Sequence, residues 1–188
     1  MRYVYDYEMY SPLNSPFHSD GLGMNYATDY PGSTQTAKFE KKLVLHYIIN
    51  HSFNLLFEGY AEKLQLEINE KTQVELIQFT VALFKRLELS LQNFQKLLLL
   101  LNRYFTKLGS EKLQLSVKQV VLGLLVQIVG ITSTNWHSVT GLPLNSVHAL
   151  VRYIDADLDE EDYDFSNEEL EMINDKMKSL IYSRFDVI

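Results

Sequence analysis

Apolar residues recur three and four positions apart along most of this chain, which is the spacing of one buried face of an α-helix. The pattern predicts helices over residues 36–57, 74–89, 91–108 and 117–131, a short helical turn near 134–140, a helix that starts at Leu142-Pro143, and a last helix that ends near Phe185. The sequence therefore predicts an all-α fold. With 188 residues, the chain is long enough for one domain with a sizeable core.

Residues that favour helix starts stand in front of three of these segments. Ser90 is suited to cap the helix over 91–108, because its hydroxyl can accept a hydrogen bond from a free backbone amide of the first turn. Ser116 with Gln119, and Ser166 with Glu169, have the three-residue spacing of a capping box. These signals fix where the predicted helices begin.

Two of the predicted helices are apolar on nearly every side. Leu97 to Leu101 is a run of five leucines inside the segment 91–108, and residues 117–131 are almost wholly apolar. A helix without a polar face must be covered by other helices. We therefore expect both segments at the centre of the fold.

The stretch from Thr132 to Leu158 contains a turn of unusual composition. Thr134 and Asn135 begin a short polar helical turn, and Trp136 and Val139 give it one apolar side. Gly141 ends the turn, since glycine adopts the backbone conformation that closes a helix.

A new helix follows this turn directly. Leu142-Pro143 is expected to start it, because proline fits the first helical turn, where its missing amide hydrogen has no partner to lose. The helical spacing predicts that Leu144, Val147, Leu150, Val151 and Ile154 form its buried stripe. The order of turn, glycine and leucine-rich helix resembles the fourth and fifth helices of the cyclin box, in the variety found in fungal cyclins that partner a nutrient-sensing cyclin-dependent kinase. The segments 74–89, 91–108 and 117–131 are similar to the first three helices of that box.

The resemblance implies a division of the chain into four parts. Residues 72–158 would form a single five-helix cyclin-like box, with one extra helix before it in the region 38–71 and one after it in the acidic connector and C-terminal helix of 159–188. Residues 1–37 would be a flexible arm rich in tyrosine, serine and proline. Only about thirty residues follow the fifth helix, too few for a second box.

The resemblance also implies a function without catalysis. A cyclin binds a cyclin-dependent kinase and pushes the regulatory helix of the kinase inward, which completes the lysine–glutamate pair that positions ATP. We therefore expect a cell-cycle-type regulatory subunit that binds and modulates such a kinase. The alternative is a cyclin-fold adaptor or scaffold that binds another protein and activates no kinase.

The expected kinase interface consists of Lys85, Gln127, Ile128, Val151 and Tyr153. In the family, a lysine near the end of the third helix and a glutamate in the fifth make much of the grip. The nearest positions here are Gln127 or Ile128 and Val151, so both charged contacts are replaced. Since a charge-assisted hydrogen bond contributes about 1.5 to 3 kcal/mol, apolar contacts would have to compensate for the loss.

Composition supports the absence of an active site. The chain has no cysteine, no glycine-rich phosphate loop and no histidine–glutamate metal pair, so we expect no enzyme, no cofactor and no metal. Its formal charge is −7 and its basic groups are short pairs, which argues against nucleic acid as a partner. We also expect no membrane contact, no small-molecule substrate and a cytoplasmic or nuclear location, because the N-terminus lacks a signal-peptide pattern.

The two ends of the chain differ in chemistry. The arm holds six of the twelve tyrosines, and the pairs Ser11-Pro12 and Ser15-Pro16 make Ser11 and Ser15 candidate phosphorylation sites, although serines before turn prolines are also common in ordinary loops. Ten carboxylates and no basic residue lie between Asp155 and Glu171; without these ten, fourteen acidic side chains face seventeen basic ones. A solvated, mobile connector is the expected structure of this segment, and an electrostatic surface for a basic partner is the alternative.

Overall fold

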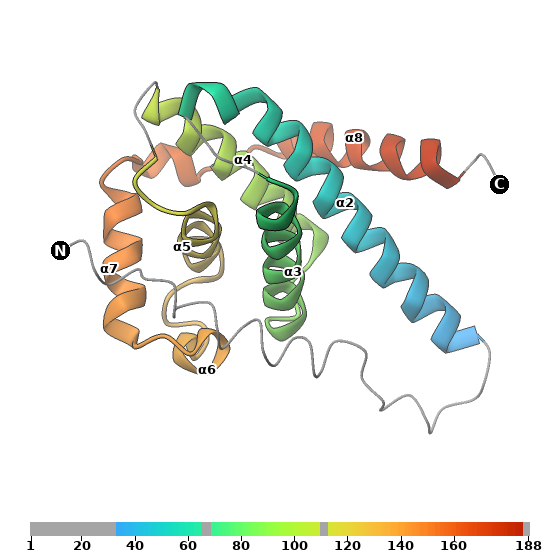
Figure 1. The fold of residues 1–188 in the computed structure, drawn as a ribbon, viewed down its shortest axis with the longest axis horizontal. Helices are drawn as coiled ribbons and strands as arrows, with labels where there is room; N and C mark the ends of the chain where they lie inside the picture. The colour runs from blue at the N-terminus through green and yellow to red at the C-terminus, as the bar shows by residue number, and fades with distance from the viewer. Residues whose placement is uncertain (1–32, 65–68, 110–112, 186–188) are drawn as a thin grey trace.

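Seven α-helices and one short 3-10 helix make up the described parts of the chain, and no strand occurs there (Figure 1). The computed structural model describes residues 33–64, 69–109 and 113–185. The helices are α2 (Ser33–Leu64), α3 (Glu70–Arg86), α4 (Leu91–Leu108), α5 (Val117–Val129), α6 (Trp136–Thr140), α7 (Leu144–Asp155), η2 (Glu160–Tyr163) and α8 (Asn167–Phe185). The all-α prediction is confirmed.

Helix α5 lies at the centre of the helical body. It packs against α3, α4 and α7, and Figure 1 shows it between α7 and α3. Eight of its thirteen residues are buried, in a single run from Gln119 to Val126. An almost entirely apolar sequence therefore becomes the helix that the others cover.

Helix α4 brings the leucine run into the same core. Leu97, Leu100 and Leu101 are fully buried, and the two leucines between them are half-buried. Phe94, one turn earlier, meets Phe53 of α2 and Phe84 of α3 edge to face, an arrangement that aromatic rings favour. The leucine run is thus covered from several directions, but the prediction that this helix is apolar on nearly every side is wrong: Asn102, Thr106 and Lys107 on its other face are exposed, so α4 is amphipathic.

The long helices at either end of the described chain pack on the same helix. α2 contacts α3, α4 and α8, and α8 contacts α2 and α4, so the two extra helices lie over α4 (Figure 1). Residues 33–37, which the sequence analysis assigns to the arm, belong to α2. The rest of the arm, with Ser11 and Ser15, lies outside the described residues.

Predicted and observed helix bounds agree where capping residues were recognised. Ser90, Ser116 and Ser166 each accept a hydrogen bond from the amide three residues later, and α4 spans the predicted residues 91–108. Gly141 has a φ of 75°, the left-handed conformation expected at the end of α6. Pro143 occupies the cap position, so α7 itself starts one residue later.

The bounds differ where a signal was missed. Asn69 and Thr72 form a reciprocal capping box, which starts α3 at Glu70 and not at Val74. α3 ends at Arg86, before Glu88 takes a positive φ of 52°. α5 ends at Val129 because Gly130 has a φ of 101°, which no helix continues.

Among the described residues, none of the helices is both long enough and apolar enough to span a membrane.

Candidate functional site

Helix α7, which carries two of the predicted interface residues, packs closely on α5. Its buried residues are Val147, Leu150 and Ile154. Gly123 of α5 allows the close approach: a Cβ atom at this position would stand 2.2 Å from Ile154 Cδ1 and 3.3 Å from Leu150 Cγ. The position of α7 therefore depends on the absence of a side chain at residue 123.

A polar contact joins the ends of these two helices. Gln127 Nε2 donates a hydrogen bond to Asp155 Oδ1 at 2.7 Å, and the Tyr163 hydroxyl donates to the same oxygen. Burial raises the pKa of Tyr163 above its usual range, and the nearby Asp155 carboxylate raises it further. Gln127 was expected to contact a partner, but its side chain forms an intramolecular hydrogen bond.

Val151 and Tyr153 lie on opposite flanks of α7. Two residues along a helix correspond to a rotation of roughly 160° the short way round. Val151 is half-buried against the core. The same flank of α7 carries Asp155 and Leu144, and the Leu144 side chain is 49% exposed. Tyr153 is 41% exposed on the other flank. The structure therefore does not bring these two predicted residues onto one surface.

Tyr104 of α4 is buried in the core. Burial raises the pKa of Tyr104 above its usual range, and the nearby Asp157 carboxylate and Tyr153 add to this effect. A tyrosine with such a pKa stays neutral at physiological pH. It acts here as a buried structural residue.

The remaining predicted residues lie elsewhere. Ile128 is half-buried and packs against the core. Lys85 is exposed near the end of α3, next to Arg86, whose Nη1 donates to the Val139 carbonyl of α6 at 2.9 Å. This end of α3 thus lies at α6, whereas Gln127 lies beside the end of α7.

The turn that motivated the family resemblance is structural. Trp136 is fully buried, and its indole N–H donates to the Gly130 carbonyl at 3.2 Å. Thr140 is also buried, and its hydroxyl donates to the Trp136 carbonyl at 2.6 Å. The motif therefore shapes the entry into α7, and its tryptophan does not face a partner.

The acidic segment packs against α4 where a solvated, mobile connector was expected. η2 contacts α4, and Lys107 pairs with Asp159 and Asp162, each at 2.5 Å. Arg103 pairs with Glu169 at 2.8 Å. Neither cation was among the predicted site residues. Their spacing of four residues, which places them on one face of α4, was the available signal.

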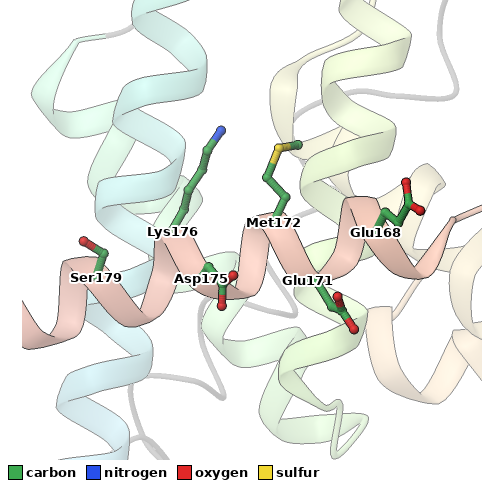
Figure 2. A pocket seen from close by; sticks show the side chains of 6 residues that line it. All are labelled: Glu168, Glu171, Met172, Asp175, Lys176 and Ser179. Carbon is green, nitrogen blue, oxygen red and sulfur yellow. The ribbon is translucent and has the colours of Figure 1, made fainter.

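Two open hollows lie on α8. One, of about 550 Å³, is lined by residues of α8 alone: Glu168, Glu171, Met172, Asp175, Lys176 and Ser179 (Figure 2). The other, of about 370 Å³, lies between α4 and α8 and is lined by four carboxamide side chains, two leucines and Glu171. In the described ranges no group of three histidine or carboxylate side chains is placed to hold a metal ion.

The sequence matches no protein-family model, and neither a curated protein nor a solved structure matches it. The likeness to cyclins consequently rests on the residues of the turn and on the order of the helices.

Proposed function

We propose that this chain is a cyclin-like regulatory subunit that binds a cyclin-dependent kinase and modulates its activity. Support comes from the all-helical fold, the order of α3 to α7, and the central position of α5. The turn from Gly130 to Pro143 also supports it, because its buried tryptophan and its glycine fix the entry into α7.

The observation that carries the proposal is the exposure of large side chains on α7. This twelve-residue helix buries one stripe on α5 and leaves Leu144 and Tyr153 open to solvent. Tyrosine is enriched among the residues that dominate binding energy at interfaces. A short helix that presents an apolar residue on one flank and a tyrosine on the other is suited to insert between elements of a partner.

Apolar contacts are large enough to replace the missing charges. Full burial of a leucine or valine side chain contributes about 1.5 to 3 kcal/mol. A charge-assisted hydrogen bond contributes about the same amount. Burial of Leu144 and of the exposed part of Val151 under a kinase would therefore offset much of the loss of the charged pair.

A cyclin-fold adaptor is the second candidate. The same α7 surface could bind a protein that is not a kinase. The hydrogen bond between Gln127 and Asp155 favours this function, because it occupies the side chain at the position where cyclins have a charged contact with the kinase. An adaptor would bind its partner without changing the activity of any kinase.

Purified components distinguish the two functions. The chain is mixed with each of a panel of purified cyclin-dependent kinases, and complex formation and phosphorylation of a standard substrate are measured. We expect one kinase to bind and to gain at least tenfold in activity. Absence of binding to every kinase in the panel would contradict the proposal, and binding without activation would favour the adaptor.

Three arginine substitutions locate the interface. Leu144→Arg places a charge on the flank shared with Val151, and Tyr153→Arg places one on the opposite flank. Tyr182→Arg is the matched control, because Tyr182 is 61% exposed on α8. We expect Leu144→Arg to weaken kinase binding by about tenfold or more, since a charge would be buried in an apolar contact. Equal binding by Leu144→Arg, Tyr153→Arg and the control would show that α7 is not part of the interface.

A further inference from the structure

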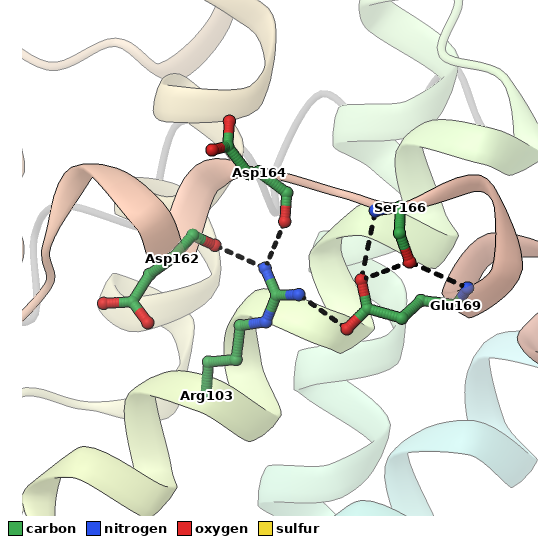
Figure 3. A network of polar contacts seen from close by, with 5 residues as sticks. All are labelled: Arg103, Asp162, Asp164, Ser166 and Glu169. Atoms are coloured by element: carbon green, nitrogen blue, oxygen red, sulfur yellow. Dashed lines mark hydrogen bonds and ion pairs between the residues drawn. The ribbon is translucent and has the colours of Figure 1, made fainter.

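The acidic segment between α7 and α8 is held on α4 by two cations. We call residues 159–166 the strap. Arg103 Nη1 donates to the carbonyl oxygens of Asp162 at 2.6 Å and of Asp164 at 2.8 Å, and Nη2 pairs with Glu169 Oε1 at 2.8 Å (Figure 3). One guanidinium therefore binds two points on the strap and the first turn of α8. Its planar arrangement of donors permits this; a lysine could not reproduce it.

The second cation, Lys107, is one turn further along the same face of α4. Its ammonium group pairs with Asp159 and Asp162. Phe165 of the strap contacts Arg103 and a third cation of α4, Lys96: Lys96 Nζ lies 5.6 Å and Arg103 Cζ 5.4 Å from its ring centroid, distances typical of cation–π contacts. Residues 96, 103 and 107 recur at seven and four residues, so all three cations line one face of α4.

Apolar packing of α8 is modest in comparison. Of its described residues only Leu170 and Met177 are buried, while Ile173, Leu180 and Ile181 are half-buried. Helix α5, which is shorter, has eight buried residues. Elements with few buried apolar contacts open at lower free energy than the core of the same protein. The charged contacts thus supply a larger share of what holds α8 than of what holds α5.

We propose that the strap is an ionic latch: Arg103 and Lys107 hold it closed, and its opening releases α8 from α4 while the body of α3 to α7 stays folded. This goes beyond the proposed function, because it concerns α8 and holds whether or not a kinase binds. Tyr163 of the strap donates a hydrogen bond to Asp155 of α7, which also accepts one from Gln127 at the end of α5, so the latch is joined to the α7 surface.

The latch makes the attachment of α8 sensitive to charge. Its ion pairs are partly exposed, with side-chain exposures of 21% for Arg103, 34% for Lys107 and 37% for Glu169, so dissolved salt and competing charged segments reach them. The packing of α5 offers no such access. A change of ionic environment should therefore act on α8 selectively.

Amide hydrogen exchange with residue resolution tests the latch. Arg103→Met removes the charge and the donors but keeps an unbranched apolar side chain over the Phe165 ring. We expect amides of α8 from Leu170 to Ile181 to exchange at least tenfold faster than in the natural chain, while those of α5 from Val120 to Val126 stay within twofold. Lys178→Met, at an exposed position of α8, is the matched control and should leave both sets within twofold.

Two results would overturn the proposal. In one, α8 exchange in Arg103→Met stays within twofold of the natural chain. In the other, α5 and α8 accelerate together, which means that the helix opens only by global unfolding. If Arg103→Met does not fold, Arg103→Lys serves instead, because it keeps the charge but loses the planar set of guanidinium donors. The amides of α8 should then exchange about three- to tenfold faster. Unchanged exchange in either variant would count against the latch.

Discussion

Helices α5 and α8 are stabilised in different ways. α5 is surrounded by α3, α4 and α7 and buries eight of its thirteen residues. α8 is longer, buries two of its described apolar residues, and is fastened at its start by Arg103 through Glu169. Apolar burial is insensitive to salt and to mild acid, whereas partly exposed ion pairs are weakened by both. The comparison teaches that one chain can combine a body of fixed structure with a helix whose attachment depends on its surroundings.

The largest expected effect comes from a change in the body. Leu100→Ala removes a fully buried side chain from the leucine run of α4 and should lower the free energy of unfolding by about 2–5 kcal/mol, because transfer and cavity terms add. Leu55→Ala, at a position that is 57% exposed, is the control and should change it by less than about 0.5 kcal/mol. Denaturant unfolding followed by Trp136 fluorescence measures both. Similar midpoints for the two variants would contradict the assignment of the leucine run to the core.

A smaller effect is expected at the contact between α5 and α7. Gly123→Ala would push Ile154 and Leu150 away and should cost about 1–3 kcal/mol, the usual range for overpacking. Gly59→Ala is the matched control inside α2, where a Cβ atom meets nothing within 4 Å, and it should stabilise the chain by about 0.5–1 kcal/mol. Thermal unfolding gives the sign of each change. A stabilising Gly123→Ala would mean that α7 does not pack so closely.

The same substitution at two helix caps sharpens the comparison further. Ser116 caps α5 and Ser166 caps α8, each with a partner three residues later. Ser116→Ala should lower the global free energy of unfolding by about 1 kcal/mol. Ser166→Ala should change the global free energy of unfolding by less than about 0.5 kcal/mol. It should instead accelerate hydrogen exchange of the α8 amides, because α8 opens separately. Equal global losses would indicate that both helices unfold as one unit.

The smallest effect on the global free energy of unfolding is expected from mild acid. Burial is the largest single influence on Asp162 and opposes its charge, but the hydrogen bonds from Lys107 and from the Asp159 backbone amide, together with the charges of Lys107 and Arg103, outweigh it and lower the pKa of this carboxyl. The backbone amide of Ser166, followed by Arg103, lowers the pKa of Glu169. Folding depresses the pKa of such a carboxyl, so the carboxyl stabilises the folded state fully at pH values above its pKa in the unfolded chain. This stabilisation is lost as pH falls through its pKa in the folded chain.

The latch should therefore weaken as pH falls below about 4, the ordinary range of carboxyl groups. The other charged groups of the strap are Asp159, Glu160, Glu161 and Asp164, and Lys96 lies on the facing helix α4; the lysines keep their charge in acid. Between pH 6 and pH 3.5 we expect α8 exchange, corrected for intrinsic rates, to accelerate before Trp136 fluorescence changes. Simultaneous change of both signals would contradict a separate opening of α8.

Much of the helical body could be predicted from the sequence because its signals are local. Ser90 and the leucine spacing set α4 at 91–108, and Gly141 set the end of α6. The start of α3 was missed by four residues because the Asn69–Thr72 capping box was not recognised. The opposite flanks of Val151 and Tyr153 follow from helical geometry and could also have been foreseen.

The rest depends on tertiary packing. Gln127 and Asp155 meet across the contact between α5 and α7, where Gly123 leaves room for Ile154 and Leu150. Arg103 reaches carbonyl oxygens 59 and 61 residues away, and no local pattern shows that an acidic segment will find this pair of cations. The segment was therefore expected to be mobile, although three of its ten carboxylates, those of Asp159, Asp162 and Glu169, attach it to α4.

Hydrogen exchange of the natural chain at 0.05 M and 0.5 M sodium chloride is the most direct test of the contrast between α5 and α8. We predict that amides from Leu170 to Ile181 exchange about five- to tenfold faster at the higher salt concentration, because surface ion pairs are screened, while those from Val120 to Val126 change by less than twofold. Equal responses of the two helices, or no response in α8, would contradict the account.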